Sequence, residues 1–430
     1  MKIRAALALF AAVSSIAYGQ AAPSSVLSPT VGPVLSAIDG TFRYSLSASE
    51  MAQIGYQGQG ASYITSLSGN AGYTSTSVTH PFGMLYSGGV LFGNQYGQGT
   101  RPFQNFVVSQ GLVTGTWNFG ISDSVSYLPQ SPTTGLSGIP GVGDLGAFPI
   151  QGPSAGPAGG VLSNNSVSIS NALSGNIERR LTGLTSISGS STWMILRYPD
   201  NNGLDTSQIS GEVGLNHRID ARDTVSGNVD YSTFSYGSNI NLTVQTKGIN
   251  GVYQRVLSRS LSMSASAGPM WISSSNSAQI PSRTTVSVNA SLGYSRKFMT
   301  ASLGYMRGVN GGSGVQPGAL SDGFMGSIGR TYGRNWMTSL SADYIRTSGL
   351  LQTTVPTPGF PYTGGASKTA FGGAQVSRRL TQSLSAFASY NLQHQSIDNS
   401  LASQNAFSGL SQTFGIGISF SPRSTRLGQF

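Results

Sequence analysis

The chain has 430 residues, only 9% of them charged, and a formal net charge of +10. Soluble domains typically have about 25% charged residues, so this composition argues against an ordinary soluble domain. The absence of cysteine excludes disulfides, cysteine-based metal sites and a lipid anchor on cysteine. No run of 18 apolar residues follows the first 20 positions, so the sequence predicts no membrane-spanning helix.

Residues 1–19 have the features of a secretory signal peptide. Lys2 and Arg4 form the positive start, residues 5–13 form the apolar stretch, and residues 17–19 (A-Y-G) form a small-x-small cleavage site. We expect export and cleavage near Gly19. Residues 20–40, rich in Pro, Ser and Ala, are expected to form a periplasmic lead-in.

From about Thr41 the chain alternates between apolar and small polar residues. The stretch from Leu261 to Trp271, L-S-M-S-A-S-A-G-P-M-W, is the clearest example. Because successive side chains of a strand point to opposite faces, such a segment has one apolar and one polar face. A strand of this length, tilted by about 40°, spans roughly 25 Å, the height of the apolar band of a membrane barrel.

Residues 129–160 interrupt the alternation with six Pro and nine Gly in 32 positions. A loop of this length is usually functional or disordered, and we hypothesise that it folds inward and narrows a pore. It contains a dinucleotide-like pattern at 141–146 and a nucleophile-elbow pattern around Ser154. Neither has the strand and helix that the chemistry requires, and the three histidines show no metal spacing, so no enzyme, cofactor or metal site is predicted.

After residue 160, short basic turns alternate with longer loops rich in Gly, Ser, Asn and Pro. Half of the 24 basic residues lie at these turns, as isolated groups rather than the continuous stripe that a nucleic-acid site shows, so no nucleic-acid partner is predicted. Short turns at one end and long loops at the other are typical of outer-membrane barrels. The turn residues are Arg179, Arg180, Arg218, Arg222, Arg255, Arg259, Arg296, Lys297, Arg330, Arg334, Arg378 and Arg379.

The sequence therefore predicts an all-β, transmembrane, antiparallel up-and-down β-barrel over residues 41–421. About 18 strands (16–18) are expected, five before the long loop and thirteen after it, with periplasmic turns and outer loops. Residues 422–430 are expected to form a C-terminal tail. Four tryptophans fall near predicted strand ends and are expected to join the aromatic girdles of a membrane barrel: Trp117, Trp193, Trp271 and Trp336.

This layout resembles that of bacterial outer-membrane porins. The phrase S-D-S-V-S-Y-L-P-Q-S-P-T-T-G-L, which begins at Ser122, also resembles uncharacterised outer-membrane barrel proteins of soil bacteria. The resemblance implies the outer membrane of a Gram-negative cell, contact with its lipids, and insertion by the barrel-assembly machinery. That machinery reads an aromatic residue at the end of the last strand, which we expect to be Phe420 rather than Phe430.

Polar residues on the inward parity of the strands are the candidates for lining a pore. Rings of charge select ions in pores, and charge is scarce elsewhere in this chain. An alternative interpretation is that these groups only hydrate the lumen. The candidates are Glu178, Glu212, Arg218, Asp230, Asn289, Asp343 and Asn391.

The function predicted from the sequence is a porin-like channel for passive diffusion of small polar solutes or ions. The alternatives are a barrel component of a polysaccharide export system, a structural or adhesive barrel without conductance, and a secreted β-solenoid. Solenoid repeats are shorter and more even than the turn spacings here. The sequence leaves the oligomeric state open, a homo-oligomer included.

Overall fold

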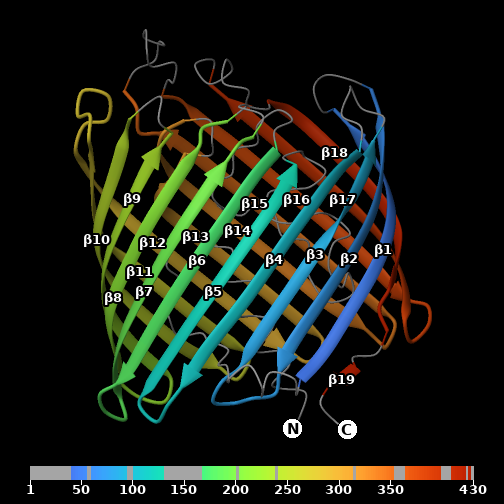
Figure 1. Cartoon of the computed structure of the whole chain (residues 1–430), viewed down its shortest axis with the longest axis horizontal. Helices are drawn as coiled ribbons and strands as arrows, with labels where there is room; N and C mark the ends of the chain where they lie inside the picture. The colour runs from blue at the N-terminus through green and yellow to red at the C-terminus, as the bar shows by residue number, and fades with distance from the viewer. Residues whose placement is uncertain are drawn as a thin grey trace.

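A computed structural model of the chain describes residues 40–55, 60–93, 100–129, 167–199, 203–237, 241–312, 316–352, 364–398, 408–422 and 425–427. These residues form a single antiparallel sheet closed into a barrel (Figure 1). The strands are β1 (Gly40–Ile54), β2 (Ser62–Ser75), β3 (Phe82–Gly93), β4 (Thr100–Val113), β5 (Trp117–Pro129), β6 (Val167–Arg180), β7 (Thr185–Arg197), β8 (Thr206–Arg218), β9 (Asp223–Tyr236), β10 (Thr243–Ser258), β11 (Leu261–Ser274), β12 (Arg283–Arg296), β13 (Met299–Asn310), β14 (Ala319–Tyr332), β15 (Trp336–Gly349), β16 (Ala366–Arg379), β17 (Leu384–Ile397), β18 (Gly409–Phe420) and β19 (Thr425–Leu427).

The barrel closes where β18 pairs with β1, in a register that places Leu46 opposite Phe420 and Ile54 opposite Gln412. Each strand from β2 to β17 pairs with the strand before it and the strand after it in the chain. Closure leaves no free sheet edge, which is the condition for a sheet to exist in hydrocarbon. The predicted fold class is confirmed: in the described residues, the barrel strands β1 to β5 precede residue 160 and the thirteen barrel strands β6 to β18 follow it.

The short strand β19 is absent from the sequence prediction. The first residues of β1, Gly40 to Phe42, extend beyond the end of β18 and pair with Thr425 to Leu427. An unpaired strand end exposes backbone N–H and C=O groups. The returning chain satisfies them, so part of the expected tail is ordered along β1 by backbone hydrogen bonds that carry no side-chain pattern.

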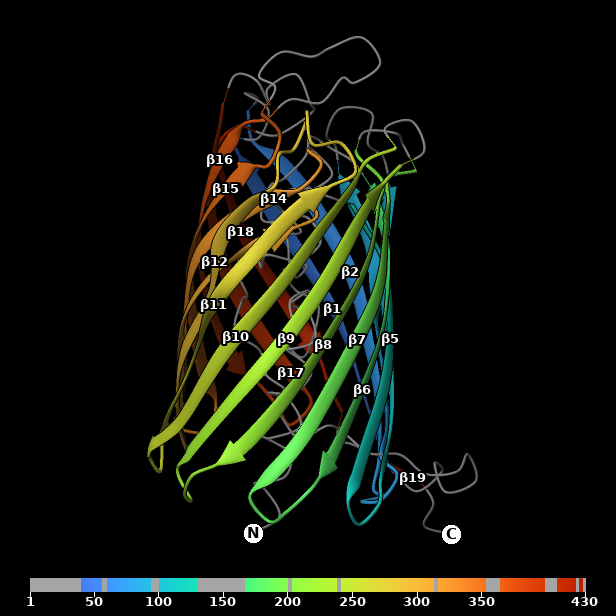
Figure 2. The same cartoon turned by 90° about the vertical axis from the view of Figure 1, so that its left-hand side faces the viewer.

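The strands run at a tilt around the barrel wall (Figure 2). Alternation of side chains along each strand separates the two faces of the wall. On β18, Ile416 is 66% exposed and Ile418 is 53% exposed, whereas Ser411 and Ser419 are each 1% exposed. A single closed sheet has nothing outside it to cover a residue, so the buried polar parity faces the interior. The exposed aliphatic side chains form the outer surface, which is the arrangement that a lipid environment requires.

Side chains fix several short turns by accepting hydrogen bonds from the backbone. Thr182 Oγ1 accepts from the N–H groups of Leu184 (3.2 Å) and Thr185 (3.0 Å), and Asp220 Oδ1 accepts from those of Arg222 (2.5 Å) and Asp223 (2.8 Å). These are Asx- and Ser/Thr-type turns. They explain why Thr or Asp stands beside the arginines of the repeated turn sequence.

Several sequence predictions concern residues outside the described ranges. They are the signal peptide at 1–19, the lead-in up to residue 39, and the long loop apart from Pro129, which ends β5. The sequence motifs at 141–146 and around Ser154 lie outside them too. Among the described residues, no helix is long and apolar enough to cross a membrane.

Candidate functional site

The inner wall is built mainly from hydroxyl and amide side chains. Neighbouring strands connect through them: Ser47 and Ser68 hydroxyls lie 2.5 Å apart, and Ser126 and Ser170 hydroxyls lie 2.6 Å apart. The sequence places small polar residues at every second position, so their hydroxyls meet across the ladder. The wall is therefore polar without carrying much charge.

Glu212 on β8 and Asp230 on β9 stand directly opposite each other on this inner wall. Each is close to the middle of its strand. The Asn228 amide donates to Glu212 Oε1 at 2.5 Å, and the Asn250 amide donates to Asp230 Oδ1 at 2.6 Å. Two neighbouring carboxyl groups are thus fixed by amides instead of by arginine or lysine.

Glycine on the adjacent strand gives these polar side chains space to lie flat. Asp230 is directly opposite Gly248, and Asn228 is directly opposite Gly214. A Cβ at position 248 would approach the Asp230 carboxylate carbon to 2.8 Å, and one at position 214 would approach the Asn228 side-chain carbon Cγ to 3.1 Å. Such distances are too short for carbon atoms that are not bonded.

The same arrangement occurs a third time, where Asn176 on β6 lies over Gly120 on β5. In all three pairs the polar side chain lies along the wall instead of across the lumen. Glu212 and Asp230 were predicted from the sequence, whereas Asn250 and these glycines were not. A glycine directly opposite a polar inward residue is the sequence signal that could have found them, once strand register was known.

The structure brings only Glu212 and Asp230 together among the predicted lining residues. Asp343 lies mid-strand on β15, opposite Met325 and Phe371. Asn289 lies on β12, opposite Ser266 and Met306, and Asn391 lies on β17, opposite Gly373 and Thr413. All three share the inward parity, on separate parts of the wall.

Glu178 and Arg218 lie at the turn end of the barrel. Glu178 on β6 is opposite Asn118 and Ser188, two residues from the end of its strand. Arg218 is the last residue of β8, and its guanidinium donates to the Gly183 carbonyl at 3.2 Å. Both charges are therefore at the rim of the inner wall rather than at its middle.

The outer part of the interior is apolar between β8 and β15, which the sequence analysis did not anticipate. Its side chains come from strand ends and from the loops, and all are 6% exposed or less: Leu204, Phe234, Tyr236, Leu242, Val244, Met270, Ile272, Ile280, Val309, Leu350 and Leu351. We call this set the outer apolar cluster. The cluster includes Phe234 and Tyr236 of β9 together with Leu350 and Leu351, which follow β15. Because β9 and β15 are not neighbours in the sheet, these side chains can share one cluster only through the interior, so the loops fold inward.

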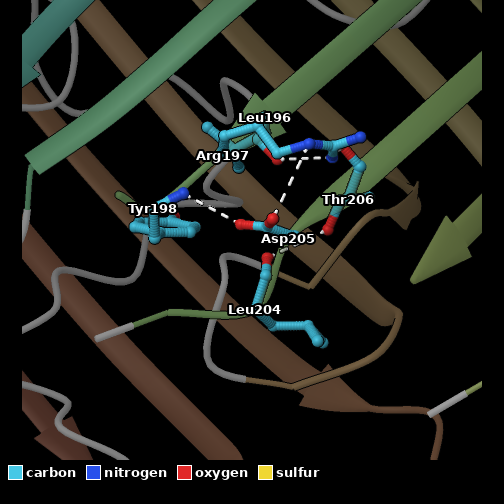
Figure 3. Close-up of polar contacts among 6 residues, drawn as sticks. All are labelled: Leu196, Arg197, Tyr198, Leu204, Asp205 and Thr206. Carbon is cyan, nitrogen blue, oxygen red and sulfur yellow. Dashed lines mark hydrogen bonds and ion pairs between the residues drawn. The ribbon is translucent and has the colours of Figure 1, made fainter. Parts of the chain in front are cut away.

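Polar contacts between the loops hold the outer apolar cluster in place. The backbone N–H of Gln352 donates to the Gln279 carbonyl at 3.1 Å, although the two loops belong to strands that are not neighbours. Figure 3 shows Asp205 between Arg197 and Tyr198. Its carboxylate accepts from the Tyr198 N–H at 2.9 Å and lies 3.6 Å from Arg197 Nε, which fixes the chain next to the buried Leu204.

The four tryptophans lie on the outward parity near strand ends. Trp117 and Trp336 are the first residues of β5 and β15, and Trp193 and Trp271 lie towards the loop ends of β7 and β11. The Arg179 guanidinium carbon is 4.9 Å from the Trp117 ring centroid, and that of Arg378 is 5.2 Å from Trp336. Cation–π contact with an aromatic ring is one role that the turn arginines perform.

A closed antiparallel barrel with an apolar outer surface, aromatic residues near both ends and a polar inner wall defines the class: an integral outer-membrane β-barrel. No family model matches the sequence, and no curated protein matches it.

Solved barrel structures are similar to the chain at low sequence identity. The FrpB iron transporter of Neisseria meningitidis is 7% identical with a TM-score of 0.45, over 85% of this chain and 64% of FrpB. OccK2 (OpdF) of Pseudomonas aeruginosa is 11% identical (TM-score 0.43), and OpdQ of the same organism is 9% identical (TM-score 0.41), each over 89% of this chain and 98% of its own. The class assignment rests on the geometry described above and not on these similarities.

Proposed function

We propose that this barrel is a porin-like channel through which small polar solutes diffuse passively, and that it prefers cations. The observation that carries the proposal is the pair of opposed carboxyl groups, Glu212 and Asp230, halfway along the inner wall. In the described part of the chain, the ion pairs are Arg197–Asp205, Arg255–Asp223 and Arg307–Asp322, so neither inner acid is neutralised by a basic residue.

A fixed negative charge on a wall surrounded by low-dielectric protein and lipid raises the local concentration of cations and lowers that of anions. Asp343, on the inward parity of β15, adds a third acid at mid-strand height. The amides of Asn228 and Asn250 hold the first two in place and bring no positive charge of their own.

The reversal potential in planar bilayers under a salt gradient tests this proposal. The wild type is expected to select cations, and the double variant Glu212→Gln/Asp230→Asn is expected to shift the reversal potential towards zero. The matched control is Asp123→Asn, which removes an acid at mid-strand height on the outer face of β5. Equal shifts in the control and the double variant would contradict a lumenal role for the pair.

A structural or adhesive barrel without conductance is the second candidate. The outer apolar cluster favours it, because apolar side chains and bridged loops occupy the interior between β8 and β15. Absence of conductance in correctly folded protein would favour this candidate over the channel. Polysaccharide export, the homo-oligomer and the barrel-assembly partner stay sequence-based predictions, as does the similarity to barrels of soil bacteria.

A further inference from the structure

An aromatic row marks the outer edge of the apolar band on β13 to β15. Tyr305, Phe324 and Tyr344 are directly opposite one another on successive strands, and the first two rings have centroids 4.6 Å apart. Phe324 is 55% exposed and Tyr344 is 43% exposed. Aromatic belts of this kind lie at the boundary between hydrocarbon and lipid headgroups.

A charged row lies two residues further towards the outer loops on the same outward face. It consists of Arg307, Asp322, Arg346 and Lys368, each directly opposite the next on β13 to β16. Two residues of strand correspond to about 6.6 Å. The charged row is therefore just outside the aromatic boundary, at the depth of the lipid headgroups.

Asp322, the acid in this row, already contacts two neighbouring side chains. Arg307 Nη1 lies 2.8 Å from Asp322 Oδ1, and the Tyr305 hydroxyl donates to the same oxygen at 3.1 Å. Arg346 and Lys368 are both exposed and directly opposite each other, and neither forms an ion pair with a described residue. Like charges directly opposite on paired strands are destabilising. An anion between the two would remove that repulsion.

We propose that Arg346 and Lys368 bind the phosphate of an anionic lipid in the outer leaflet. Arginine presents a planar fork that matches phosphate oxygens, and lysine supplies a compact positive charge beside it. The position of the pair selects a lipid as the source of the phosphate, since both side chains lie on the lipid-facing parity next to an aromatic row. This inference requires membrane insertion only and does not depend on whether the barrel conducts.

Lipid binding to full-length protein in detergent tests the inference. Native mass spectrometry would measure the affinity for a diphosphorylated glycolipid (lipid A), its monophosphorylated form and its dephosphorylated form. The wild type is expected to bind the diphosphorylated form most tightly. Removing a cation near an anionic lipid surface weakens binding about 5-fold, so Arg346→Gln/Lys368→Gln is expected to lose roughly 25-fold.

The matched control is Arg330→Gln/Arg378→Gln, which removes two outward-facing cations at the opposite end of β14 and β16. It is expected to leave lipid A affinity unchanged. Equal losses in the two double variants would overturn the proposal, because the effect would then be general surface charge. Displacement of the lipid by millimolar inorganic phosphate would overturn it as well, since the site would then bind a free anion.

The charge-swap variant Lys368→Glu provides an independent check. It places an acid opposite Arg346, so the repulsion between the two cations is removed even when no lipid is bound. The lipid-free barrel is therefore expected to be more stable than the wild type, while its phosphate-dependent binding of lipid A is expected to fall. Heat-modifiable migration on a gel reports the folded fraction of every variant. Unchanged lipid binding by folded Lys368→Glu would overturn the proposal.

Discussion

Asp230 lies across the ladder onto Gly248, the residue directly opposite it on β10, so a methyl group at position 248 would collide with its carboxylate. The carboxyl group is held there by the Asn250 amide at 2.6 Å. Gly248 therefore determines the direction in which the Asp230 carboxylate points. This relationship allows the position of the charge to be changed without removing it.

Gly248→Ala is expected to push the Asp230 carboxylate off the wall and to separate it from Asn250. The net charge of the lumen stays the same, so a change in the reversal potential or in single-channel conductance would report the position of the charge alone. Gly251→Ala on the same strand is the control, because the nearest described atom to its added Cβ is 4.0 Å away. If Gly248→Ala and Gly251→Ala had the same conductance and selectivity, the placement of the Asp230 carboxylate would have no influence on permeation.

Asp123 provides the second prediction, because it is an acid on the outer face of β5, seventh of thirteen residues. Its neighbours across the ladder are Val108 and Leu173, and its carboxylate accepts a hydrogen bond from the Asn171 amide at 2.8 Å. An acid facing lipid at mid-depth destabilises a barrel, by less than the roughly 2–4 kcal/mol found for Arg or Lys. Asp123→Leu is therefore expected to stabilise the barrel in lipid vesicles.

Urea titration of the vesicle-inserted protein, followed by tryptophan fluorescence, would measure that change. Val125→Leu, on the same outward face of β5, controls for added apolar volume. A loss of stability in Asp123→Leu would contradict lipid exposure. It would indicate that the hydrogen bond from Asn171 stabilises the wall by more than the exposed acid destabilises it.

The sequence predicted the strands well because period-two alternation is a local property that a closed barrel enforces at every strand. The end of β18 at Phe420 and the inward parity of Glu212 and Asp230 both follow from that rule. The contact between Asp230 and Gly248 could not be predicted, because the two residues lie on different strands and their proximity depends on register. The inward-folded loops escaped prediction for a related reason: Ile280 is a single large apolar residue in the polar loop between β11 and β12, without a period to reveal it.

The outer apolar cluster leads to the third prediction. Ile280 is fully buried in it and belongs to the loop between β11 and β12. Truncating a buried isoleucine to alanine costs about 2–5 kcal/mol in a packed core. Ile280→Ala is expected to loosen this loop while the barrel wall stays folded, because its strands are held by backbone ladders.

Limited proteolysis and single-channel recording together would detect this loosening. Faster cleavage in residues 275–282 with unchanged heat-modifiable migration is the expected result, together with more frequent or larger openings if the loops restrict the mouth. Ile249→Ala is the control, since that isoleucine is 53% exposed on the outer face. Wild-type cleavage rates in Ile280→Ala would mean that the cluster does not anchor the loops.

The turn between β8 and β9 gives a prediction about pH. Hydrogen bonds from the backbone N–H groups of Arg222 and Asp223 lower the pKa of Asp220 below its ordinary value of 3.8. Because this pKa is depressed in the folded protein, ionised Asp220 stabilises the turn at pH values above the ordinary aspartate pKa. This stabilisation is lost as the pH falls through the lowered pKa. Protonation removes the charge that strengthens both hydrogen bonds, so the turn is expected to open more often in acid.

Amide hydrogen exchange at Asp223, corrected for the intrinsic effect of pH, would measure this opening. The turn at Thr182 is the internal control, because its hydroxyl accepts the equivalent hydrogen bonds from Leu184 and Thr185 without titrating. Asp220→Asn keeps the acceptor oxygen and is expected to make the two turns behave alike across the acid range. If Asp223 and Thr185 already showed the same pH dependence in the wild type, the ionised carboxylate of Asp220 would have no part in holding the turn closed.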